Sequence, residues 1–93
     1  MKNDRMYLEH ILESIIQVQE YIRGISKGDF ISSPIIRDAV VRRMEIIGEA
    51  AKNVSTATKR KNRPVPWKKM AGMRDILIHK YFGVDYNLVW KTC

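Results

Sequence analysis

Cysteine is almost absent from this sequence, and the single one, Cys93, is the last of 93 residues. One thiol cannot form an internal disulfide, which is typical of a protein from a reducing compartment. No apolar run approaches the roughly 20 residues that a membrane-spanning helix needs. The first residues also lack the apolar core of a signal peptide. These absences predict a cytoplasmic protein that has no membrane segment.

The usual motifs for holding phosphates or metals are missing as well. The 5 glycines are scattered along the chain, so no glycine-rich phosphate loop is present. Two distant histidines, His10 and His79, and a terminal cysteine make a poor set of metal ligands. Glu45 and Glu49 share a helical face and could bind a metal, but a salt-bridged surface is the better interpretation. The sequence therefore predicts neither a cofactor nor a metal site.

Acidic residues are missing from one long stretch of the chain. The net charge is +7, and no aspartate or glutamate occurs between Glu49 and Asp75. A block of one charge sign suits a polyanion, whereas a solvated loop that maintains solubility is the alternative. Six basic residues of this stretch are the candidates for contact with RNA: Lys59, Arg60, Lys61, Arg63, Lys68 and Lys69.

Apolar residues recur at three- and four-residue steps in three long segments, which predicts an all-α domain. The expected helices cover about residues 4–26, 34–54 and 66–82, with a short fourth helix at 86–91. The apolar face of the first is Leu8, Ile11, Leu12, Ile15, Val18, Ile22 and Ile25. A bundle of this size buries a small core, for which oligomerisation is a common remedy.

Several local signals set the expected boundaries of these helices. Asp4 is a plausible N-cap for the first helix. Gly24, Gly28 and Asp29 are stop signals after it, of which Gly28 is best placed to end the helix. Ser33 and Pro34 form the capping residue and first turn of the second helix. Residues 55–66 contain a basic run and two prolines, and are expected to form a loop. Phe30 is expected to lie in a short connector and to plug the core.

The segment 73–81 places a cation, an imidazole and a phenol in an apolar helix that is expected to be central in the bundle. Arg74 and Tyr81 share one face, whereas Arg74 and His79 diverge by about 140°. A second copy of this helix would bring two arginine and histidine sets around one cleft, as in a homodimer.

Histidine can transfer protons near neutral pH, and arginine matches phosphate, so the set suits metal-free RNA cleavage. The alternative is a pair of satisfied core residues beside a helix-capping arginine. Asp75 could orient either side chain or simply pair with a lysine.

The spacing Arg74-x4-His79-x-Tyr81 resembles the motif of the HepT-like toxins, a branch of the HEPN superfamily. The second-helix segment 43–52, the lead-in 66–74 and the exit through Tyr81-Phe-Gly-Val-Asp85 and Val89-Trp90 are similar too. Together they cover most of residues 5–90, which makes the resemblance specific.

This resemblance implies an antiparallel up-and-down HEPN bundle in a single domain over residues 1–93, acting as a homodimer. It implies a metal-independent endoribonuclease in which Arg74 and His79 are catalytic. It also implies a type VII-like toxin–antitoxin pair, in which an MntA-like nucleotidyltransferase transfers AMP to Tyr81. Family members usually have a longer final helix, whereas the sequence here ends three residues after Trp90, so its fourth helix is expected to be short. The alternatives are a non-catalytic protein that binds RNA or a nucleotidyltransferase, and a helper subunit that positions the nucleotidyltransferase's substrate.

Overall fold

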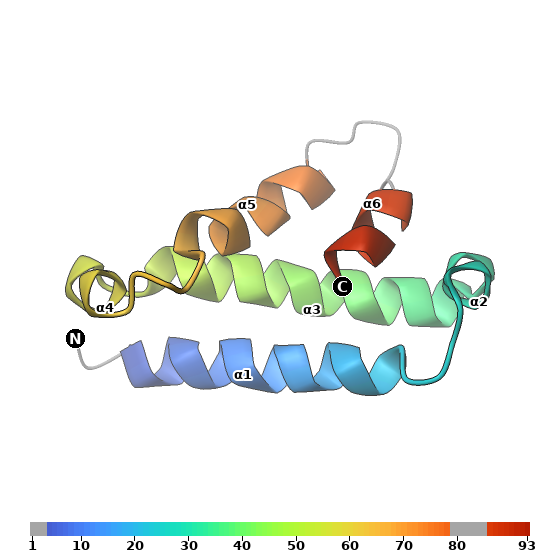
Figure 1. Ribbon diagram of the computed structural model, residues 1–93, viewed down its shortest axis with the longest axis horizontal. Coiled ribbons are helices and arrows are strands. Elements are labelled where there is room, and N and C mark those ends of the chain that lie inside the picture. Colours follow the sequence, from blue (N-terminus) through green and yellow to red (C-terminus); the bar gives the residue numbers. More distant parts are fainter. Residues whose placement is uncertain (1–3, 79–85) are drawn as a thin grey trace.

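The computed structural model describes residues 4–78 and 86–93, except for the side chains of residues 73–78. All regular structure in these residues is helical, as predicted (Figure 1). The helices are α1 (Asp4–Tyr21), α2 (Lys27–Ser32), α3 (Pro34–Asn53), α4 (Thr56–Lys61), α5 (Trp67–Ile78) and α6 (Tyr86–Thr92). The three long helices and the short last one are those expected, whereas α2 and α4 are additional.

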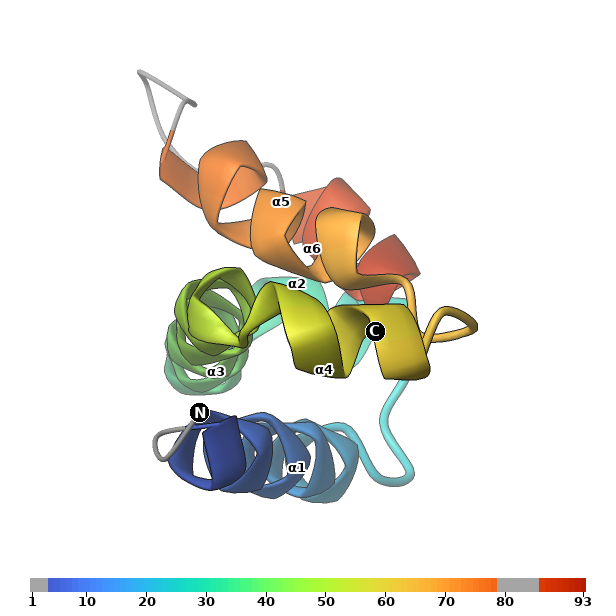
Figure 2. The same ribbon diagram turned by 90° about the vertical axis from the view of Figure 1, so that its left-hand side faces the viewer.

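Helix α3 forms the middle of the bundle. It packs along α1 on one side and along α5 on the other, and consecutive long helices run in opposite directions (Figures 1 and 2). The prediction that α5 would be the central helix is therefore wrong. α3 occupies that place because it buries apolar or small residues toward both neighbours: Val40, Met44, Ile47, Gly48, Ala50 and Ala51.

The first helix ends earlier than expected, at Tyr21 rather than near Ser26. Gly24 adopts a φ of 72°, a left-handed conformation that favours glycine, so Gly24 and not Gly28 turns the chain. Ser26 then caps α2 through a capping box, in which its side chain and that of Asp29 each accept the other's backbone N–H. The predicted connector is thus a helix, and its Phe30 is fully buried as expected.

The start of α3 matches the prediction. The Ser33 hydroxyl accepts the backbone N–H of Ile36 at 3.3 Å, and Pro34 occupies the first turn. Proline is favourable there because the first backbone N–H groups of a helix have no partner within the helix.

The expected loop at 55–66 contains the six-residue helix α4, so that prediction is wrong in part. Ser55 caps α4 by accepting the backbone N–H of Thr58 at 3.3 Å. The Asp4 carboxylate accepts the Ser55 hydroxyl at 2.6 Å, the Ser55 backbone N–H at 3.0 Å and the Thr58 hydroxyl. Asp4 is therefore a tether between α1 and α4, 51 residues away from Ser55, rather than only a candidate cap for its own helix.

Replacing Asp4 by asparagine is expected to lower the melting temperature by several degrees near neutral pH. Hydrogen bonds from the Ser55 and Thr58 hydroxyls, and then from the Ser55 backbone, hold the pKa of this carboxyl well below its usual range. The carboxylate therefore stabilises the fold above its unfolded pKa of about 3.9, and this stabilisation fades as pH falls below that value. Thermal melts at a series of pH values from 7 to 2 measure this effect. The melting temperature of the variant should fall less steeply with falling pH than that of the parent protein.

The matched control for this prediction is Asp38→Asn, which removes an exposed carboxylate from α3. We expect its melting curve to follow the parent protein at each pH. If the melting temperatures of Asp4→Asn and the parent protein fall equally as the pH is lowered, the stabilising role of the tether is contradicted.

The core consists of two clusters on either side of the middle of α3. At one end α6 closes a cluster made of Val18, Phe30, Val40, Met44 and Val89. At the other end α5 covers a cluster made of Ile11, Ile47, Ala50, Ala51 and Val54. The predicted apolar face of α1 is only partly buried, since Leu12 is 60% exposed and Leu8 and Ile15 are each 37% exposed. This face is wider than the strip that α3 covers.

In the part of the chain that the structure describes, none of the helices is long and apolar enough to cross a membrane.

Candidate functional site

The predicted catalytic residues belong to the end of α5 and the segment that follows it. Arg74 and Asp75 occupy backbone positions in the second half of α5, but their side chains are outside the described residues. His79 and Tyr81 lie entirely outside them. The arrangement of these side chains around a cleft therefore stays a prediction, while the helix that carries two of them is placed.

Helix α5 is anchored to the core by its first half. Trp67, Met70 and Ala71 pack against the cluster around Ile47 and Ala51. From this anchor α5 rises away from α3, so that its C-terminal end lies at the edge of the bundle (Figures 1 and 2). At about 1.5 Å per residue, α5 carries the chain about 16 Å from Trp67 to Ile78. The motif therefore begins about 10 Å from the anchored end, at Arg74, and the described part of α5 ends about 16 Å from it, at Ile78.

The loop between α4 and α5 contributes to an open groove of about 730 Å³, here called the basic groove. It is lined by Thr56, Lys59, Arg60, Arg63, Val65, Pro66, Trp67, Lys68 and Lys69. Five of the six basic residues predicted to contact RNA therefore share one surface. Lys61 does not line it, because α4 turns that position to another side.

The position of Trp67 in this groove is fixed by hydrogen bonds. Its indole N–H donates to the carbonyl oxygen of Asn62 at 3.1 Å. The Asn62 side chain, just after α4, in turn donates to the carbonyl oxygen of Thr58 within α4 at 2.9 Å. Trp67 is half-buried, so part of its ring packs on the core and part lines the groove.

The sequence placed Trp67 in a helix, but its place in this surface was not predicted. A signal for it was present, since Trp67 is the one aromatic residue in the acid-free stretch. An aromatic side chain among cations is the composition of many nucleic-acid-binding surfaces.

Helix dipoles explain only some of the positive charges around the basic groove. Lys59, Arg60 and Lys61 lie in the last turn of α4, where the partial negative charge of the helix end favours cations. Lys68 and Lys69 lie in the first turn of α5, where the helix end is partially positive and disfavours them. Among the described residues, no acidic side chain lines the groove to compensate. These two lysines therefore favour an interpretation in which the groove binds an anion.

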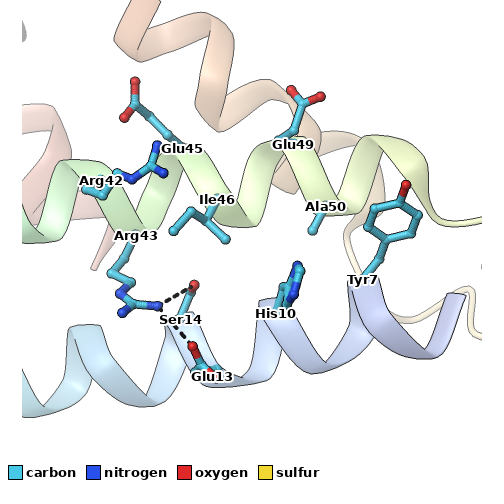
Figure 3. Close-up of a pocket in the computed structure, with 10 residues that line it drawn as sticks. All are labelled: Tyr7, His10, Glu13, Ser14, Arg42, Arg43, Glu45, Ile46, Glu49 and Ala50. Atoms are coloured by element: carbon cyan, nitrogen blue, oxygen red, sulfur yellow. Dashed lines mark hydrogen bonds and ion pairs between the residues drawn. The ribbon is translucent and has the colours of Figure 1, made fainter. Parts of the chain in front are cut away.

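A second groove, of about 610 Å³, lies between α1 and α3. Figure 3 shows His10 and Glu13 of α1 and Arg43 of α3 beside it, while Glu45 and Glu49 project away from α1. The same groove is lined by Tyr7, Ser14, Arg42, Ile46 and Ala50. Its three carboxylates and two guanidinium groups oppose each other, so it suits a polyanion less than the basic groove does.

Arg43 links the two helices at this second groove. Its guanidinium donates to Glu13 at 3.4 Å and to Ser14 at 3.5 Å (Figure 3). A hydrogen bond with Tyr21, and then the contact with Glu13, raise the pKa of Arg43 above its already high ordinary value. Arg43 is thus a permanent cation held by α1, and its role is to join helices.

The acidic residues of α3 give no sign of a metal site. Glu49 accepts a hydrogen bond from the Asn53 side chain at 3.4 Å, whereas the salt-bridged surface expected at Glu45 and Glu49 stays a prediction. Across residues 4–78 and 86–93, no three histidine, cysteine, aspartate or glutamate side chains are grouped so as to hold a metal ion. His10, the one of the two histidines that the structure describes, is exposed and lines the second groove.

Comparison with known proteins gives a consistent result for nearly the whole chain. The family model described as "Ribonuclease HepT-like" matches residues 11–93. A protein of Caldanaerobacter subterraneus subsp. tengcongensis, named "Putative RNase TTE0752", is 51% identical over 92 residues, covering 99% of this chain and 82% of the relative. A Thermococcus cleftensis protein named "Probable ribonuclease HepT" is 46% identical over 91 residues, covering 98% of this chain and 83% of the relative. No solved structure is significantly similar to the chain.

Proposed function

Since this chain belongs to the HepT-like ribonuclease family, we propose that it is an endoribonuclease that cleaves RNA without a metal ion. The observation that carries the proposal is the family match over residues 11–93, which includes the complete Arg74-x4-His79-x-Tyr81 motif. Arg74 and His79 are the proposed catalytic residues, and Asp75 is proposed to orient one of them. The basic groove supports the choice of RNA as the substrate, because its cations suit a phosphate backbone.

The proposed reaction uses the nucleophile that RNA itself carries. His79 removes the proton from a 2′-hydroxyl, and the 2′-oxygen attacks the adjacent phosphorus. The bond from phosphorus to the 5′-oxygen breaks, and a second acidic group protonates that leaving oxygen. The Arg74 guanidinium stabilises the negative charge that develops on the phosphorane-like transition state. The products are a 2′,3′-cyclic phosphate and a free 5′-hydroxyl.

A homodimer is proposed to complete this site. His79 follows Arg74 by five positions, a spacing that on a continuous helix would turn the two side chains about 140° apart, so one chain would present only half of a compact site. A second copy packed α5 against α5 would supply the other half, including the second proton-transfer group. The position of α5 at the edge of the bundle supports this arrangement, since its end leads away from α3 (Figure 2).

Tyr81 is proposed to be the residue that switches the activity off. In a type VII-like toxin–antitoxin pair, an MntA-like nucleotidyltransferase would transfer AMP from ATP to the Tyr81 hydroxyl and release pyrophosphate. The added bulk and negative charge would occupy a cleft that otherwise holds a phosphate. Incubation with such an enzyme and ATP should add AMP to the parent chain, detected by intact mass, and should leave Tyr81→Phe unmodified. Addition to both chains would place the modification elsewhere.

Purified protein incubated with a single-stranded RNA and EDTA is expected to cut the RNA as fast as it does without EDTA. The same oligonucleotide with a 2′-deoxy sugar at every position should remain intact, because the proposed nucleophile is missing. Denaturing gels of end-labelled substrates measure both rates. Loss of cleavage in EDTA would reject the metal-free mechanism.

The non-catalytic alternative predicts a different outcome in the same assay. It predicts salt-dependent binding of RNA that leaves the oligonucleotide intact in both buffers.

A further inference from the structure

The lining of the basic groove combines two kinds of side chain. The exposed or half-buried cations Lys59, Arg60, Arg63, Lys68 and Lys69 share it with three apolar residues, Val65, Pro66 and Trp67, which we call its floor. The groove therefore offers apolar surface, including an aromatic ring, beside positive charge.

This combination fits an unpaired nucleotide better than a helical duplex. Single-stranded nucleic acid binds to grooves in which cations contact phosphates and aromatic side chains stack on bases. In a double helix the faces of the bases are covered by their neighbours, and recognition depends on the backbone and the 2′-hydroxyls. The Trp67 ring could not stack on a base within a duplex, so the floor selects for an unpaired base.

The groove is held in place from both of its sides. The Asp4 tether fixes the start of α4, which carries Lys59 and Arg60. The bond from Trp67 to Asn62 fixes the loop to the start of α5, which carries Lys68 and Lys69. Five cations without a carboxylate among the described lining residues repel each other, so holding them together is unfavourable unless an anion binds between them.

The distance along α5 relates this groove to the proposed cleavage site. The floor residue Trp67 lies about 16 Å from the end of the described helix at Ile78, next to which His79 follows. A single strand spans this length with a few nucleotides. One RNA strand could therefore occupy the groove and reach the catalytic segment.

We propose that the basic groove is a substrate subsite that holds an unpaired nucleotide of single-stranded RNA, a few nucleotides from the bond that is cut. The base stacks on Trp67 and Pro66, and the flanking phosphates contact Arg60, Arg63 and Lys68. The proposal rests on the proposed ribonuclease function for its substrate, but binding in the groove can be measured without cleavage.

The test measures binding in the His79→Ala chain, so that the RNA stays intact. A single-stranded oligonucleotide long enough to span the groove and the catalytic segment is expected to bind more tightly than the same sequence in a duplex. Replacing both Arg60 and Lys68 by alanine is expected to raise the Kd for the single strand by about tenfold or more, and to lower the slope of log K against log salt by about 0.7 for each phosphate that the variant no longer neutralises.

The matched control for the double variant is Lys61→Ala. It removes an adjacent exposed cation that does not line the groove. Because that cation is outside the groove, its loss should change the Kd by less than about threefold, as expected for weak attraction at a distance.

Tryptophan fluorescence tests the stacking part of the proposal. The chain has two tryptophans, Trp67 in the groove and Trp90, which packs on Phe30 at 5.4 Å between ring centroids. Single-stranded RNA should quench the parent protein and Trp90→Phe, and quenching should be lost in Trp67→Phe. Far-UV circular dichroism checks that each variant keeps its helices.

The outcomes separate this proposal from the ribonuclease function. Equal loss of affinity in Lys61→Ala and the double variant, or equal binding of single strand and duplex, would overturn the subsite. RNA cleavage by the parent protein with no change of Kd in the double variant would overturn the subsite alone. Selective loss of single-strand binding in a protein that never cuts RNA would support the subsite and reject the ribonuclease.

Discussion

In a His79→Ala variant, the rate of RNA cleavage is expected to fall by about 10²–10⁴-fold, the usual contribution of a positioned proton-transfer group. The change removes the imidazole that we propose to activate the 2′-hydroxyl, and no other histidine of the chain is near it in sequence. Single-turnover cleavage of a labelled oligonucleotide at saturating protein measures the chemical step separately from binding. Helix content, measured by circular dichroism, should stay the same.

The matched control is His10→Ala, since His10 is the one other histidine of the chain. It is exposed on α1 beside the second groove, and its loss should leave the cleavage rate unchanged. An equal loss of activity in the two variants would show that His79 has no special role.

Substitutions of Arg74 test the same proposed site. Arg74→Lys keeps a positive charge but loses the planar fork that matches phosphate, so we expect most of the effect of Arg74→Ala to remain. Combining Arg74→Ala with His79→Ala should lower the rate by much less than the product of the two single effects, because the two groups act in one transition state.

Replacing Phe30 by alanine is expected to have the largest effect on stability, lowering the free energy of unfolding by about 3–5 kcal/mol. Phe30 is fully buried and contacts Trp90, with the rings tilted by 37° and their centroids 5.4 Å apart. Its removal leaves a cavity at the point where α2, α3 and α6 meet. Because small domains are stable by only about 5–15 kcal/mol, urea denaturation should show a greatly reduced midpoint.

The nearby control is Ile35→Ala in the first turn of α3. Ile35 is 82% exposed, so truncating it should change the free energy of unfolding by no more than about 0.5 kcal/mol. A similar loss for both variants would mean that α2 and α6 do not form a core around Phe30.

The parts of the fold that the sequence predicted correctly are those with local signals. Ser33 and Pro34 determine the start of α3 because a cap needs only the next few residues. The helix α2 also had a local signal, Ser26-x-x-Asp29, but Gly28 and Asp29 were interpreted as stop signals. Helix α4 could not be predicted in this way, because part of its cap comes from Asp4, which is 51 residues from Ser55 in the sequence.

The central position of α3 was missed for a related reason. Apolar residues surround much of the α5 sequence, which is the usual pattern of a central helix. That pattern does not reveal which neighbours a helix has. The wide apolar stripe of α3 and its small residues Gly48, Ala50 and Ala51 did predict burial on more than one side, which is confirmed, but they did not show that α1 and α5 are the two neighbours.

Charge alone predicted much of the basic groove but not its shape. The acid-free stretch identified all five cations that line it, and also Lys61, which does not. A count of charges cannot separate Arg60 from Lys61, because the rotation of α4 decides which residue faces the groove. The apolar floor was missed because Trp67 and Pro66 were interpreted only as the start of a helix.

The tether at Asp4 has a practical consequence for anyone who makes this protein. The carboxylate that holds α4 is at position 4, so a purification tag attached ahead of Met1 would begin within a few residues of the tether to Ser55. A charged tag would then place its charges within a few residues of the Asp4 carboxylate. RNA affinities measured on such a fusion would report the tag together with the protein, and removing the tag is the simplest remedy.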